Sequence, residues 1–137
     1  MPEIIRLLCV DDEINILNVI RRQLLDENIE IHCALTVSKG LQFLQEHRPM
    51  QVIVSDYRMP GMNGMEFLKQ AELICPEAVF IILSGFADIP IVKQSLENKH
   101  LFRILRKPWR AEELRKVIGD AVRSSRQTSS TSHGAIL

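Results

Sequence analysis

The sequence predicts an α/β domain in which helices cover both faces of a parallel sheet. Five short apolar runs alternate along the chain with five stretches whose apolar residues recur at helical spacing. Several of the runs are almost continuously apolar, as is typical of strands that are buried on both faces. Regular alternation of such strands with helices predicts a doubly wound parallel sheet. The expected strands are residues 4–10, 29–34, 52–55, 79–83 and 102–105.

A helix is expected after each strand, because apolar residues three or four positions apart form one inward face. The inward residues are Ile16, Leu17, Ile20 and Leu24 in the first helix, Leu41 and Leu44 in the second, Leu68, Ala71 and Ile74 in the third, Ile89, Val92 and Leu96 in the fourth, and Leu114, Val117, Ile118 and Ala121 in the fifth. Thr36 and Asp88 precede the second and fourth helices and are expected to cap them. Pro90 is tolerated in the first turn of the fourth helix.

Length and composition indicate one ordinary globular domain. The 137 residues are 46% hydrophobic and 25% charged, which suits a single buried core. We expect this domain to span residues 1–125, and residues 126–137, which lack a hydrophobic pattern, to form a Ser/Thr-rich linker or disordered tail. Seventeen basic residues balance 17 acidic ones, so neither nucleic acid nor membrane is an expected partner. No signal peptide or long apolar span is evident, and the expected location is cytoplasmic.

Acidic side chains follow two of the predicted strands at the point where each ends. Asp11 and Asp12 come directly after residues 4–10, and Asp56 follows residues 52–55. In open parallel sheets, ligands bind beyond the carboxyl ends of the strands. Clustered carboxylates repel one another unless a cation joins them, and hard oxygen ligands suit Mg²⁺ or Mn²⁺. We expect Asp12 and Asp56 to be direct ligands and Asp11 to reach the ion through water.

Further residues at strand ends complete a candidate site for phosphoryl transfer. Asp56 is the candidate nucleophile, because its strand holds the carboxylate rigidly. Lys107 could pair with the new anion, Ser84 could hydrogen-bond a phosphoryl oxygen, and Gly85 leaves room for the phosphate. Each signal alone has a simpler interpretation: a helix cap for the acidic run, a turn for Asp56 or a loop serine for Ser84. Their co-occurrence at successive strand ends favours the functional interpretation.

Four segments match the pattern of a known family over about residues 4–125. They are Val10-Asp-Asp-Glu13, Asp56-Tyr-Arg-Met-Pro-Gly-Met-Asn-Gly64, Leu83-Ser-Gly85 and Lys107-Pro108. With these segments the chain resembles the CheY-like receiver domain of bacterial two-component response regulators. The resemblance implies a flavodoxin-like sheet of five strands in the order 2-1-3-4-5, and a cis peptide bond before Pro108.

The resemblance also implies how the site works. Mg²⁺ would be held by Asp12, Asp56 and the backbone carbonyl of Arg58, with Asp11 assisting. A sensor histidine kinase or a phosphotransfer protein would supply the phosphoryl group to Asp56. Such a domain is not an enzyme with a separate substrate, although it catalyses its own phosphorylation and dephosphorylation.

Phosphorylation would draw the Ser84 hydroxyl inward and remodel the surface of the fourth helix, fifth strand and fifth helix. That surface would control an output domain or a partner protein, and it would also allow a homodimer. We expect the output to lie outside this sequence, either in a further segment or in another protein, because no DNA-binding element follows residue 126.

The chain departs from the family pattern near the conserved lysine. The family often has an aromatic residue three positions before it, where this chain has Ile104. Phe102 is expected to point to the same side of the strand as Ile104. The Lys107-Pro-Trp109 segment and Arg58 resemble receivers fused to cyclic-di-GMP phosphodiesterase modules of the HD-GYP type or to other enzymatic outputs. Trp109 could equally be a core or helix-capping aromatic.

Two large side chains are placed to protect an aspartyl phosphate. Arg58 lies two residues after Asp56, and Phe86 lies two residues after Ser84. Water must attack in line with the bond that breaks, so bulk beside that path is expected to slow hydrolysis. The alternative is that both side chains face solvent and have no such role.

Two other functions compete with this interpretation. A phosphatase of the haloacid dehalogenase class also uses a strand-end Asp with Mg²⁺, but it requires a second Asp two residues on, where this chain has Arg58. An interaction module that works without phosphorylation would have no need of the site residues, whereas every acidic, hydroxyl and lysine position is filled. The sequence therefore favours a phosphorylated switch.

Overall fold

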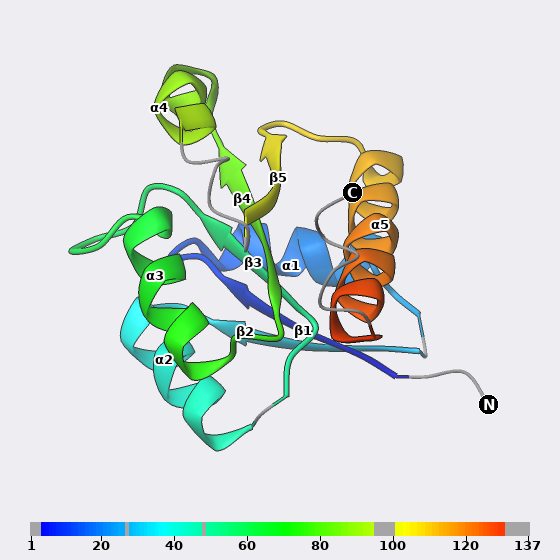
Figure 1. Ribbon diagram of the computed structural model, residues 1–137. Coiled ribbons are helices and arrows are strands. Elements are labelled where there is room, and N and C mark those ends of the chain that lie inside the picture. The colour runs from blue at the N-terminus through cyan, green and yellow to red at the C-terminus, as the bar shows by residue number, and fades with distance from the viewer. Residues whose placement is uncertain (1–3, 27, 48, 95–100, 131–137) are drawn as a thin grey trace.

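A computed structural model of the chain describes residues 4–26, 28–47, 49–94 and 101–130. Strands and helices alternate along it (Figure 1). The strands are β1 (Ile5–Val10), β2 (Ile29–Ala34), β3 (Val52–Asp56), β4 (Val79–Ser84) and β5 (Leu101–Arg106). The helices are α1 (Ile14–Gln23), α2 (Val37–Glu46), α3 (Gly64–Ile74), α4 (Ile89–Lys93) and α5 (Ala111–Ser130), with a short 3-10 helix, η1 (Phe86–Asp88), before α4.

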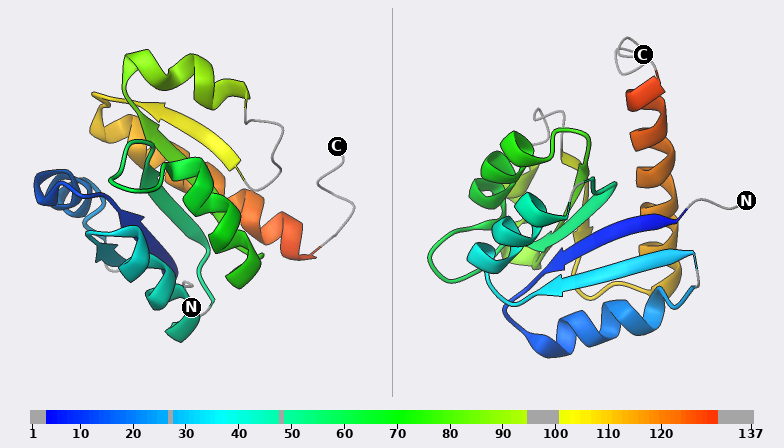
Figure 2. Two further views of the ribbon diagram at one scale, coloured as in Figure 1. Left: turned by 90° about the vertical axis from the view of Figure 1, so that its left-hand side faces the viewer. Right: turned by 90° about the horizontal axis from the view of Figure 1, so that it is seen from below.

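The described strands form one parallel sheet in the order β2-β1-β3-β4-β5. The predicted doubly wound, flavodoxin-like fold is therefore confirmed. Helices α1 and α5 cover one face of the sheet, and α2, α3 and α4 cover the other (Figure 2). Because all strands run the same way, the carboxyl ends of β1, β3, β4 and β5 lie at one edge.

The predicted strands are confirmed to within one residue at each end. Strands β3 and β4 are buried along their whole length, which explains why their sequences are almost continuously apolar. The predicted inward residues that are buried are Leu17, Ile20, Leu24, Leu44, Leu68, Ala71, Val92, Leu114, Val117, Ile118 and Ala121. Those that are half-buried are Ile16, Leu41, Ile74 and Ile89. Leu96 lies outside the described residues.

Strand β5 contains an irregularity that the sequence pattern did not predict. Phe80 pairs with Leu101, whereas the next residue of β4 pairs with Arg103, so Phe102 is an extra residue in β5. Phe102 packs with the core beneath α1 and α5, and Ile104 packs with the core on the opposite face. The expectation that these two side chains share a side is wrong, because a β-bulge interrupts the alternation of side chains.

One of the two predicted helix caps is present. The hydroxyl of Thr36 accepts a hydrogen bond from the backbone N of Lys39 at 3.0 Å and so caps α2. Asp88 precedes α4, but its side chain makes no capping hydrogen bond. That prediction is wrong because both carboxylate oxygens of Asp88 accept hydrogen bonds from the guanidinium of Arg58 instead. Pro90 lies in the first turn of α4, as expected.

Helix α5 extends beyond the predicted end of the domain at residue 125. It runs to Ser130, and residues 131–137 lie outside the described residues. The role of residues 126–137 as a linker stays a prediction. Neither α5 nor another described helix has the combined length and apolar character that a membrane span requires.

Gly64 lets α3 begin directly against the end of β3. Its backbone N donates to the carbonyl of Tyr57 at 2.7 Å, and a Cβ at Gly64 would lie only 2.7 Å from the carbonyl oxygen of Asp56. We expect Gly64→Ala to lower the free energy of unfolding by about 2–3 kcal/mol, because the backbone on either side must shift. Urea unfolding measures the loss. Gly85→Ala is the control, since a Cβ there meets no non-neighbouring atom within 4 Å; equal losses would contradict the prediction.

Candidate functional site

Three carboxylates meet at the edge of the sheet where β1 and β3 end. Asp11 and Asp12 follow β1, and Asp56 is the last residue of β3. They lie together because β1 and β3 are paired neighbours. One carboxylate oxygen from each residue lies within 4.8 Å of the oxygens from the other two. Asp11 and Asp56 are buried and Asp12 is exposed, so the cluster meets solvent on the Asp12 side.

Lys107 supplies a cation to this acidic cluster. Its Nζ lies 3.0 Å from Oδ1 of Asp56 and 3.9 Å from Oδ2 of Asp11. The backbone N of Lys107 donates to the carbonyl of Ser84 at 2.9 Å, which ties the end of β5 to the end of β4. The peptide bond between Lys107 and Pro108 is cis, in agreement with the resemblance. The structure thus brings the predicted cation beside the predicted nucleophile.

Asp11 is a buried carboxylate with one oxygen that lacks a hydrogen-bond donor. Its Oδ1 accepts a bond from the backbone N of Glu13 at 2.9 Å. Its Oδ2 is buried and accepts no hydrogen bond within the described part of the chain. The pKa of Asp11 is raised to about 6, chiefly by burial. The charges of Asp56 and Asp12 add to the rise, whereas the hydrogen bond from the backbone N of Glu13 and the charge of Lys107 oppose it. A buried anionic oxygen in this state is suited to a cation.

The donor set fits a hard divalent cation. All three side chains offer carboxylate oxygens, which are the ligands that Mg²⁺ and Mn²⁺ prefer. Mg²⁺ keeps several waters when it binds, and the exposed side of the cluster at Asp12 leaves access for them. Among the described residues, the His, Cys, Asp or Glu side chains that lie close enough together to hold a metal ion are those of Asp11, Asp12 and Asp56.

Ser84 and Gly85 lie at the end of β4, beside the end of β3. Asp56 pairs with Leu83 across these two strands, so Ser84 is one residue beyond that partner. Ser84 is buried, and its hydroxyl donates to the carbonyl of Gly85 at 3.1 Å. A Cβ at Gly85 would meet no non-neighbouring atom within 4 Å, so there is space beside this backbone. The Ser84 hydroxyl would have to leave Gly85 to bind a phosphoryl oxygen.

The two residues that were expected to shield the site have other contacts. The guanidinium of Arg58 donates from Nε to Oδ2 of Asp88 at 2.6 Å and from Nη2 to Oδ1 at 2.9 Å. This hydrogen bonding lowers the pKa of Asp88 and raises the pKa of Arg58. Phe86 is 76% exposed, and Cζ of Arg106 lies 5.6 Å from its ring centroid. The proposed effect of Arg58 and Phe86 on hydrolysis stays a prediction.

Trp109 lies between the cis peptide bond and α1. Its Nε1 donates to Oε1 of Gln23 at 2.6 Å, and its half-buried ring packs against the core beneath α1 and α5. An apolar groove of about 410 Å³ at this place is lined by Ile16, Val19, Gln23, Lys107, Pro108 and Trp109. These contacts support the structural interpretation of Trp109, and the likeness to HD-GYP-fused receivers stays a prediction.

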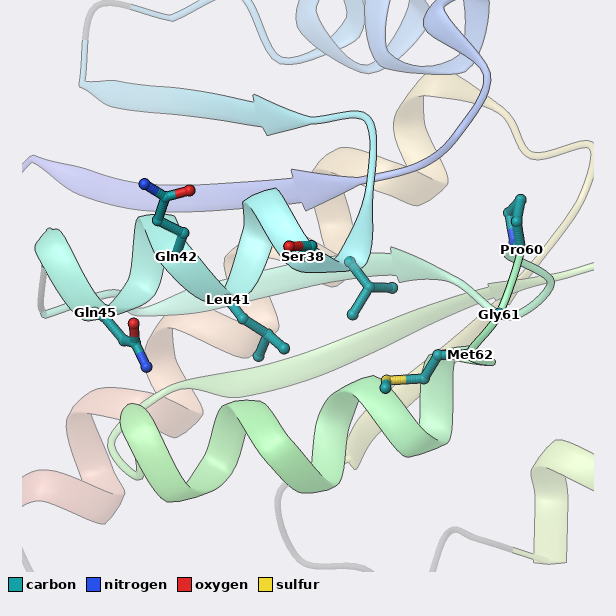
Figure 3. Close-up of a pocket in the computed structure, with 8 residues that line it drawn as sticks. Ser38, Leu41, Gln42, Gln45, Pro60, Gly61 and Met62 are labelled. Atoms are coloured by element: carbon teal, nitrogen blue, oxygen red, sulfur yellow. The ribbon is translucent and has the colours of Figure 1, made fainter.

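The groove in Figure 3 lies between α2 and the loop after β3. It measures about 480 Å³ and is lined by Val37, Ser38, Leu41, Gln42, Gln45, Pro60, Gly61 and Met62. None of these side chains ionises near neutral pH, so the groove offers no acid–base group, and nothing in its lining would activate the Ser38 hydroxyl as a nucleophile. A hollow of about 460 Å³ does reach the acidic cluster and is lined by Asp12, Tyr57, Arg58, Met59, Pro60 and Asn63.

The raised pKa of Asp11 predicts how stability depends on pH in the metal-free protein. The pKa rises from 3.8 to about 6 on folding, so the folded state retains a proton that the unfolded state loses in this window, and stability falls as pH rises through it. Asp11→Asn removes this cost. We expect the free energy of unfolding of the variant to exceed that of the parent by up to about 3 kcal/mol at pH 8 and by up to about 1.6 kcal/mol at pH 5.

Urea unfolding in excess chelator at the two pH values measures this difference. Asp12→Asn is the control, because Asp12 is exposed and should gain little. An equal gain for Asp11→Asn at pH 5 and pH 8 would show that its ionisation is not the cause.

Comparison with protein families identifies one match. The family model described as response regulator receiver domain matches residues 7–119. The hydrogenase transcriptional regulatory protein HoxA of Cupriavidus necator is 35% identical over 117 residues, which cover 84% of this chain and 23% of that protein. The chain spans about a quarter of the length of the first curated relatives that it matches.

Solved structures show the same fold. The structure of adenylate cyclase from Rhodopirellula baltica superposes with a TM-score of 0.88 at 29% identity, over 93% of each chain. A response regulator receiver domain protein from Clostridium thermocellum superposes with a TM-score of 0.83 at 29% identity, over 90% of this chain and 98% of that one. The likeness therefore covers the sheet and the helices on both of its faces.

Proposed function

The chain belongs to the family of response regulator receiver domains, and we propose that it accepts a phosphoryl group on Asp56 and thereby alters a binding surface. The observation that carries the proposal is the position of the Asp56 carboxylate, which lies at the end of a buried strand, 3.0 Å from Lys107 and among the carboxylates of Asp11 and Asp12. Receiver domains are not classical enzymes. We propose that this chain catalyses only its own phosphorylation and dephosphorylation.

Asp56 acts as the nucleophile. Lys107 pairs with Oδ1 of Asp56, so we assign the attack to Oδ2. A bond forms between Oδ2 and phosphorus, and the bond from phosphorus to the donor breaks, with its electron pair leaving on the donor. The donor is a phosphohistidine of a sensor kinase or phosphotransfer protein, or a small acyl phosphate. In dephosphorylation, water attacks phosphorus, the bond from phosphorus to Oδ2 breaks, and the products are inorganic phosphate and the free carboxylate.

The residues of the acidic cluster would hold Mg²⁺ or Mn²⁺ at this site. Asp12, Asp56 and the backbone carbonyl of Arg58 are the proposed direct ligands, and Asp11 contributes through water. The bound ion would neutralise charge that develops on the phosphoryl oxygens. The buried oxygen of Asp11 that lacks a donor supports this assignment. Lys107 adds a further positive charge from the carboxyl end of β5, at the same edge of the sheet.

Ser84 and Lys107 read out the modification. Each gains a charge-assisted hydrogen bond that exists only when Asp56 carries the phosphoryl group. The Ser84 hydroxyl leaves the carbonyl of Gly85 to make that bond. Ser84 lies just before η1 and α4, and Lys107 lies between β5 and α5, so both shifts reach the α4–β5–α5 surface. This surface would bind an output domain, a partner protein or a second copy of the chain.

Labelling with acetyl phosphate tests the proposed function. In Mg²⁺, intact-mass analysis of the whole chain should show the addition of one phosphoryl group, and peptide mapping should place it on Asp56. In excess chelator, the labelling should be lost. Equal labelling with and without the divalent cation, or a label on another residue, would refute the proposal.

A further inference from the structure

A bidentate ion pair joins the loop after β3 to the start of α4. Arg58 follows the proposed phosphorylation site by two residues, and Asp88 is the residue immediately before α4. Two nitrogens of the guanidinium donate to the two carboxylate oxygens, at 2.6 and 2.9 Å. Parallel hydrogen bonds of this kind fix both distance and orientation. The loop that follows Asp56 and the start of α4 are therefore joined through two side chains.

The two partners differ sharply in exposure. The side chain of Asp88 is 7% exposed, whereas that of Arg58 is 76% exposed. Asp88 makes no capping hydrogen bond to α4, so the contacts found for its carboxylate are those from Arg58. Without the guanidinium, Asp88 would be a nearly buried charge that lacks a partner, which is strongly unfavourable. The start of α4 therefore depends on Arg58 for its position.

We propose that Arg58 is a latch, whose guanidinium holds Asp88 in the unphosphorylated chain and moves to the phosphoryl group when Asp56 is phosphorylated. This inference rests on the function proposed above. A phosphoryl group brings up to about two negative charges within two residues of Arg58. A guanidinium binds phosphate and carboxylate through the same planar fork. The exchange thus replaces one bidentate contact with another to a more highly charged group.

The exchange changes the position of α4. Once Arg58 has left, Asp88 turns toward water, and the first turn of α4 moves with it because Ile89 is the next residue. A ligand shifts an equilibrium only through its different affinity for the two states, and the guanidinium supplies that difference here. Ile104 occupies the position on β5 where related domains often have an aromatic residue. The latch gives phosphorylation a route to α4 that needs no aromatic side chain there.

Two single substitutions test the exchange in the whole chain. Acetyl phosphate with Mg²⁺ is the phosphoryl source, intact mass reports labelling, and NMR reports the amide shifts of Ile89–Lys93. Arg58→Gln keeps the backbone carbonyl that is the proposed metal ligand at this residue, so it can be compared with the parent at the same degree of labelling. Its phosphorylation-induced shifts should fall below half of those in the parent. Before labelling, the amide signals of Asp88→Asn should already be shifted toward those of the phosphorylated parent. Labelling should then move them by less than half of the change seen in the parent.

Three further variants separate the latch from a general effect of charge or folding. Arg103→Gln removes another exposed arginine that pairs with an aspartate, Asp120, and should leave the shifts unchanged. Arg58→Lys keeps the charge without the fork and should give an intermediate response. The exchanged pair, Arg58→Asp with Asp88→Arg, restores an ion pair but places a carboxylate at residue 58. It should fold and, at the same degree of labelling as the parent, show little movement of α4.

The outcomes distinguish the latch from the function on which it rests. Parent-like shifts in fully labelled Arg58→Gln, or in the exchanged pair, would overturn the latch and leave the proposed function intact. Failure of the parent itself to be labelled on Asp56 would overturn the proposed function.

Discussion

Asp56→Asn should lower the rate of phosphoryl uptake from acetyl phosphate at least about 100-fold, which corresponds to about 2.7 kcal/mol of activation free energy. The amide is neutral and nearly the same size as the carboxylate, so it removes the nucleophile and leaves the packing at the end of β3 almost unchanged. Its oxygen can still accept a hydrogen bond from Lys107, which lies 3.0 Å from Oδ1 of Asp56. Intact mass over a time course in Mg²⁺ measures the rate.

Two other asparagine variants serve as controls for this result. Asp12→Asn keeps the acceptor but loses a proposed metal ligand, so it should be labelled slowly and recover in part at higher Mg²⁺. Asp26→Asn changes an exposed aspartate near the end of α1 and should be labelled at the parent rate. Parent-like labelling of Asp56→Asn would mean that another residue accepts the phosphoryl group.

The fold and the acidic cluster could be predicted because both are encoded locally. A strand that is buried on both faces must be apolar throughout, so the runs that become β3 and β4 stand out in the sequence. An acidic residue directly after such a run has to lie at the edge of the sheet. Parallel strands share that edge, so Asp11, Asp12 and Asp56 could be placed together before their distances were known.

The features that could not be predicted depend on contacts across space. Asp88 is a suitable helix cap by its position, yet Arg58, 30 residues earlier, takes both of its oxygens. Phe102 fits an alternating strand, yet the register of β5 against β4 makes it the extra residue of a bulge. A local pattern cannot report either competition, because the deciding partner lies on another element. The same limit applies to the buried oxygen of Asp11, whose lack of a donor is a property of its surroundings.

Lys107→Met should largely uncouple phosphorylation from the α4–β5–α5 surface. The ammonium lies between Asp56 and Asp11, at 3.0 and 3.9 Å, and should form a stronger, charge-assisted hydrogen bond once the phosphoryl group is present. Losing a bond of about 1.5–3 kcal/mol that is made mainly in one state changes the equilibrium between the states about 10- to 150-fold. Met keeps the length and apolar stem of the side chain, so the change is chiefly one of charge. NMR shifts across β5 and α5 at full labelling measure the coupling.

Arg106→Met is the matched control, because it removes the neighbouring cation, whose Cζ lies 5.6 Å from the ring of Phe86 rather than against the acidic cluster. That variant should retain the shifts of the parent.

The unphosphorylated Lys107→Met chain provides a second readout, since Lys107 lowers the pKa of Asp11 and its loss should raise that pKa further. Full parent shifts in labelled Lys107→Met would exclude Lys107 from the switch. Equal losses in both variants would show that positive charge near the end of β5, and not the contact with Asp56, carries the signal.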